Sequence, residues 1–145
     1  MSDHSPLSRP LRAGMRTAAL GLKAHRARGH VPAQVWVGVP GTTEPAQSVN
    51  FDTGHGAPRT TLDRGHHVDI VMSLVLAVRD RVDTPLLWIV RSGGPEPSSE
   101  DLRWYSTSRE VWAELGLPHG FAVITREGWT HLPSGVEQRW KRLRK

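Results

Sequence analysis

Two arginines, Arg91 and Arg126, stand at matching places in two similar stretches of the chain. Each directly follows a short apolar run, 86–90 (LLWIV) in the first case and 121–125 (FAVIT) in the second. Such runs are typical of buried strands, and the helical stretch between them predicts a β-α-β unit with parallel strands. The carboxyl ends of parallel strands meet at one edge of a sheet, where ligands commonly bind. We therefore expect Arg91 and Arg126 to lie on the same edge, near enough to share a phosphate or carboxylate.

The alternative for this pair of arginines is a structural role. Carboxylates that could neutralise them lie close by in the sequence: Glu96, Glu100, Asp101 and Glu127. If each arginine pairs with its own carboxylate, the fold is preserved but no cation remains for a ligand. Ser98 predicts the N-terminal cap of the helix between the two runs, and Asp101 would fall in the first turn of that helix.

A second kind of chemistry is offered by His66, His67 and Asp69, at the start of another predicted helix. Imidazole and carboxylate groups bind zinc, and a zinc ion can activate water. His66 and Asp69 are three residues apart and share a helical face. No His-Glu-x-x-His motif is present, so capping and surface roles are the alternative. These three residues are the metal candidates, and no cofactor is predicted.

Positive charge gathers at both ends of the chain. The net charge is +5, and no acidic residue occurs between Asp3 and Glu44. Basic ends around a mixed-charge middle indicate contact with an anionic partner, although solubilising termini would look the same. The residues expected to contact such a partner are Arg9, Arg12, Arg16, Lys23, Arg26, Arg28, Arg139, Lys141 and Arg142.

Trp129 is an aromatic candidate for the same contact. It comes three residues after Arg126, and an exposed ring beside a basic group is what single-stranded nucleic acid requires. The alternative is burial of Trp129 against a final helix through Trp140.

Periodicity and turn residues predict the elements that must position these groups. They are a basic amphipathic helix over 7–27, a strand at 34–39, a loop over 41–65 with a short strand near 48–51, a helix over 67–82, a strand at 86–90, a helix over 99–115, a strand at 121–125, a loop to 135 and a short basic helix from 136. The expected fold class is α/β, a small and mainly parallel sheet of three or four strands with flanking helices and a basic helix at each end. Residues 1–30 are expected to form a basic amphipathic arm, and residues 31–145 one α/β domain with the long loop at 41–65.

Composition excludes several classes of protein and of functional site but does not identify the function. The chain has no cysteine, which excludes disulfides, thiolate metal sites and a cysteine nucleophile. No apolar run is long enough to span a bilayer, and no phosphate-loop, dinucleotide or hydrolase motif occurs. A cytoplasmic, non-enzymatic protein that binds nucleic acid or an acidic protein is favoured. The alternatives are a hydrolase or phosphate-ester enzyme at the strand ends, and an assembly protein that forms homo-oligomers through the N-terminal helix.

Overall fold

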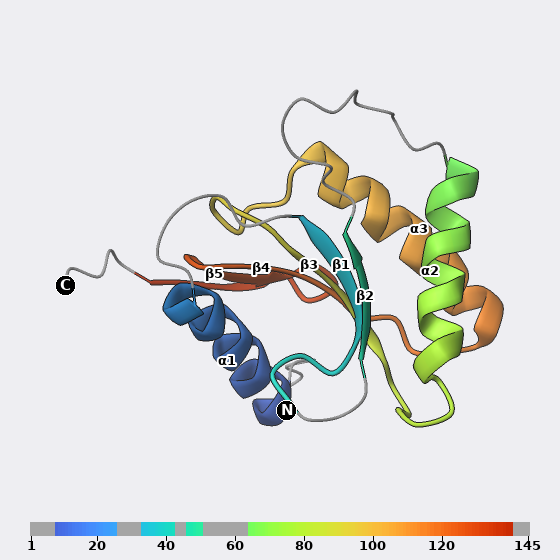
Figure 1. Cartoon of the computed structure of the whole chain (residues 1–145), viewed down its shortest axis with the longest axis horizontal. Helices are drawn as coiled ribbons and strands as arrows, with labels where there is room; N and C mark the ends of the chain where they lie inside the picture. Colours follow the sequence, from blue (N-terminus) through green and yellow to red (C-terminus); the bar gives the residue numbers. More distant parts are fainter. Residues whose placement is uncertain (1–7, 26–32, 43–45, 51–63, 141–145) are drawn as a thin grey trace.

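The computed structural model describes residues 8–25, 33–42, 46–50 and 64–140 (Figure 1). The elements in chain order are α1 (Arg9–His25), β1 (Gln34–Gly38), β2 (Gln47–Asn50), α2 (Arg64–Val78), β3 (Leu86–Val90), α3 (Ser99–Leu115), β4 (Phe121–Thr125), β5 (Gly128–His131) and β6 (Val136–Arg139). The strands form one sheet in the order β2-β1-β3-β4-β5-β6. Helix α1 covers one face of this sheet, and α2 and α3 cover the other (Figure 1).

The predicted fold class is wrong in the size and direction of the sheet. Six strands are present rather than three or four, and most neighbours are antiparallel. The predicted β3-α3-β4 unit is confirmed, and β3–β4 is the one parallel pair among the described strands. The sheet grows on both sides of this pair by hairpins, β1–β2 on one side and β4-β5-β6 on the other, and hairpins are necessarily antiparallel.

The expected C-terminal basic helix is also wrong, because residues 136–139 form the edge strand β6. A turn over 132–135 closes the β5–β6 hairpin, with the Gly135 amide donating to the His131 carbonyl at 2.9 Å. Gly135 has φ +76°, a left-handed conformation that glycine adopts without strain. Of the residues of this edge strand, only Val136 is half-buried.

The basic helix α1 forms a layer of the fold. Its apolar stripe lies against β4 and β5, with Met15 and Ala19 fully buried. The side chain of Ser8 accepts a hydrogen bond from the Leu11 amide at 3.1 Å and so caps the first turn. The stripe that suggested an assembly element is therefore used within the chain, against sheet residues that include Ile124 and Trp129.

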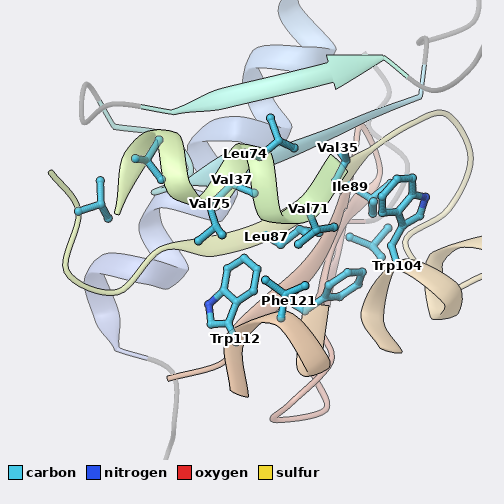
Figure 2. Packing of buried hydrophobic residues seen from close by; sticks show 14 residues of the cluster. Val35, Val37, Val71, Leu74, Val75, Leu87, Ile89, Trp104, Trp112 and Phe121 are labelled. Carbon is cyan, nitrogen blue, oxygen red and sulfur yellow. The ribbon is translucent and has the colours of Figure 1, made fainter. Parts of the chain in front are cut away.

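The larger core fills the space between the other sheet face and helices α2 and α3 (Figure 2). Trp104 and Trp112 of α3 are fully buried there, and the Trp112 indole donates to the Pro85 carbonyl at 2.9 Å. All residues of β3 and β4 are buried because helices cover both faces of the central strands. Among the described residues, no helix is long and apolar enough to cross a membrane.

Candidate functional site

Arg91 lies at the predicted edge of the sheet, but its guanidinium is occupied within the fold. Its Nη2 atom is 2.7 Å from a carboxylate oxygen of Asp101, whose side chain is 1% exposed. The remaining N–H groups of Arg91 donate to the same carboxylate and to the carbonyls of Ser92, Gly94 and Glu96. A guanidinium has five N–H donors, and each of these has an acceptor here. Arg91 thus stabilises the turn after β3, and none of its donors is left for a ligand.

Arg126 follows β4 at the same edge of the sheet, in the turn 126–127 before β5. The strands pair Leu87 with Phe121, one residue out of step with the resemblance between the two apolar runs, so Arg91 and Arg126 are not level across the parallel pair. Arg91 turns toward α3, where Asp101 lies, and has no donor left for a ligand. The pair is therefore not an anion clamp.

The proposed metal ligands also diverge. His66 and Asp69 are exposed, but His67 is buried against α3, with its ring 4.3 Å from that of Trp104 and its Nε2 atom 3.7 Å from Glu100. Within the residues that the structure describes, no group of three or more His, Cys, Asp or Glu side chains could hold a metal ion. His67 contributes to packing between the two helices.

A serine–histidine pair that sequence reasoning missed lies where β4 begins. The Ser108 hydroxyl oxygen is 2.7 Å from Nε2 of His119, and the hydroxyl also donates to the Tyr105 carbonyl at 2.9 Å. Because a hydroxyl has one proton to donate, Nε2 of His119 must carry the proton that joins the pair. Ser108 is fully buried, so no substrate reaches its oxygen. The hydrogen bond between Ser108 and His119 links α3 to the residues just before β4. Only the fold brings these residues together, since no motif links them.

His119 makes the stability of the protein sensitive to acid. Burial lowers its pKa from 6.5 to about 4, and the nearby Arg109 and His131 act in the same direction. The unfolded chain therefore binds a proton that the folded chain excludes between pH 6.5 and about pH 4. We expect the contribution of neutral His119 to be complete above pH 6.5 and to be lost as the pH falls through this window.

Urea denaturation at a series of pH values measures this effect. The expected loss is about 1–2 kcal/mol, discounted because the ring is partly exposed to water. A His119→Gln variant should show a flatter dependence above about pH 5, where carboxylates contribute little. An equal slope in both proteins would assign the acid sensitivity to other groups.

The basic residues of α1 form the clearest exposed feature among the predicted contacts. Arg9, Arg12 and Arg16 are exposed on the helix whose opposite stripe is buried on the sheet. We call these three residues the cationic face. The helix carries no carboxylate, so no acidic side chain of α1 neutralises them.

Trp140, directly after β6, connects the cationic face to the end of the sheet. The guanidinium carbon of Arg16 lies 5.7 Å from the centre of the Trp140 ring, within the range of a cation–π contact. The Trp140 indole donates to the carbonyl of Arg126 at 2.9 Å. The N-terminal helix thus contacts the residue that follows β6, and Lys141 and Arg142 lie outside the described residues.

The other predicted contacts differ in their surroundings. Trp129 is 2% exposed and lies under α1, so its ring cannot be a surface stacking platform. Arg139 is exposed but is paired with Glu96 at 3.0 Å and lies 3.9 Å from Glu137. Five predicted contacts have no described side chain, namely Lys23, Arg26, Arg28, Lys141 and Arg142.

The fold brings together two polar side-chain pairs, Arg91–Asp101 and Ser108–His119, and each links two parts of the fold through a buried partner, Asp101 or Ser108. The arginines of α1 are instead exposed. Comparison of the chain with protein-family models, with curated proteins and with solved structures found no match in any of the three.

Proposed function

We propose that this protein is a cytoplasmic, non-enzymatic binding domain that holds the phosphate backbone of a nucleic acid on the cationic face of α1. The observation that carries the proposal is the exposure of Arg9, Arg12 and Arg16 on a helix that has no carboxylate. Anchoring of the other side of α1 on the sheet holds these arginines on one outer surface of the molecule.

The spacing of the cationic face suits a polyanion. A helix rises about 1.5 Å per residue, so Arg9 and Arg16 are separated by about 10 Å along the axis. Double-stranded DNA carries one negative charge per about 1.7 Å of its axis, so several phosphates fall within this length. Guanidinium groups donate paired hydrogen bonds to phosphate oxygens, which makes arginine well suited to this contact.

Salt dependence of binding tests the proposal. In electrophoretic mobility shift assays, the full chain should retard nucleic acid at about 50 mM salt and bind much more weakly at about 200 mM, because phosphate contacts release counterions. The double variant Arg9→Gln/Arg12→Gln should reduce the slope of log affinity against log salt by about 1.4–1.8, the value for two lost phosphate contacts.

A matched variant separates this local effect from total charge. Arg79 and Arg81 are exposed just after α2, the helix that covers the sheet face opposite α1. Arg79→Gln/Arg81→Gln removes the same charge and should leave the slope near that of the original protein. Equal slopes for the two double variants, or no retardation at low salt, would refute the proposal.

A further inference from the structure

Trp140 adds an aromatic ring to the cationic face. The ring is half-buried, and its indole N–H is held by the Arg126 carbonyl at 2.9 Å, which fixes one edge of the ring against the turn between β4 and β5. Arg16 lies over the ring, with its guanidinium carbon 5.7 Å from the ring centre. A fixed aromatic ring and an exposed guanidinium therefore lie next to each other at the end of the cationic face.

We infer that the nucleic acid bound here is single-stranded, and that one of its bases stacks on Trp140 beside Arg16. The inference rests on the proposed function above. Aromatic rings stack on unpaired bases of any type, whereas the bases of a duplex are already stacked on one another. In the free protein, Arg16 lies over one face of the Trp140 ring. A base that stacks on this face displaces the Arg16 guanidinium, which then binds a neighbouring phosphate.

The surface of α1 around this point favours binding without sequence preference. Over residues 9–22, the part of α1 whose side chains are described, the exposed positions other than the arginines are Pro10, Ala13, Thr17, Leu20 and Gly21. None of these described side chains is an amide or a carboxylate, the groups that read adenine and cytosine edges in pairs of hydrogen bonds. Apart from a guanine edge, which arginine can read, contacts from this surface are to phosphates and to base faces, which every sequence presents.

Binding of three fluorescently labelled probes tests the inference. They are oligothymidine and oligouridine of about 12 nucleotides, and a duplex of the same length, titrated by anisotropy at about 50 mM salt. We expect the full chain to bind either or both single strands at least about tenfold more tightly than the duplex. A preference between thymidine and uridine strands would identify DNA or RNA as the partner.

Two leucine variants isolate the ring of Trp140. Trp140→Leu should weaken single-strand binding by about tenfold and leave duplex binding nearly unchanged. Trp36→Leu is the matched control, since Trp36 is also half-buried but stacks on Trp88 in β1 and β3, with ring centres 5.8 Å apart. Equal losses in the two variants, or equal binding of duplex and single strand, would overturn the inference while leaving the proposed function intact. Failure of the unmodified chain to bind any probe would refute both.

Tryptophan fluorescence provides a second readout with variants that keep an aromatic ring. Saturating oligothymidine should quench the emission of the original protein, because a base stacked on an indole quenches it. Trp140→Phe should lose most of this quenching, and Trp36→Phe should retain it. Undiminished quenching in the Trp140→Phe protein would place the base elsewhere, whatever the leucine variants do to the fold.

Discussion

Replacement of Arg91 by methionine is expected to lower the free energy of unfolding by about 3–5 kcal/mol, the usual cost of removing one partner from a buried ion pair. The Asp101 carboxylate, with its side chain 1% exposed, would lose the cation and keep the Ser98 amide at 2.8 Å. The carbonyls of Ser92, Gly94 and Glu96 would also lose their donor. Urea denaturation followed by circular dichroism measures the loss.

Arg103 is the matched control for this prediction. It pairs with Glu100 at 2.8 Å on the exposed side of α3, where both side chains are solvated. Surface pairs of this kind contribute less than about 1 kcal/mol, so Arg103→Met should change stability little. If the two methionine variants lost the same stability, the Arg91–Asp101 pair would have no special structural role.

Replacement of Gly14 by alanine is expected to destabilise the protein by about 1–3 kcal/mol, although alanine is the better helix former. Gly14 lies where α1 touches the turn after β1, and a Cβ atom there would overlap the carbonyl oxygen of Pro40. Backbone cannot yield as a flexible side chain does, so α1 must shift away from the sheet. The loss should appear in thermal unfolding as a lower Tm.

The same helix supplies a control of opposite sign. Gly21 has open space where its Cβ would be, with no heavy atom within 4 Å. Gly21→Ala should therefore stabilise the protein by about 0.5–1 kcal/mol through helix propensity alone. If both alanine variants were stabilised, the close contact between α1 and Pro40 would not constrain the packing of the helix.

Sequence patterns located the central elements because their signals are local. The bounds of β3 and β4 are those predicted, and α3 begins after the predicted cap, Ser98, which forms a capping box with Asp101. The outer strands were missed because β5 and β6 have four residues each, too few for a clear period. Whether β1 runs parallel or antiparallel to its neighbours depends on the strands beside which it lies, and tertiary packing determines those neighbours.

The candidate site, too, could be predicted only where its signals are local in the sequence. The shared edge of Arg91 and Arg126 followed from parallel strands, which the sequence does indicate. The register offset of one residue between the two strands, and the contacts that occupy the Arg91 guanidinium, depend on tertiary pairing that neither apolar run encodes by itself. The cationic face could be predicted because helical period and charge are both local properties, whereas the contact between Arg16 and Trp140 joins the two ends of the chain.

The position of α1 in the chain has a consequence for folding during synthesis. The strands that receive its apolar stripe, β4 and β5, are made roughly a hundred residues after the helix, and at ribosomal speeds this delay is about 5–20 s. Throughout this interval Met15 and Ala19 lack the two strands that complete their burial. The layer encoded first is therefore completed last, and a nascent chain halted before β5 would present an uncovered, positively charged amphipathic helix to its surroundings.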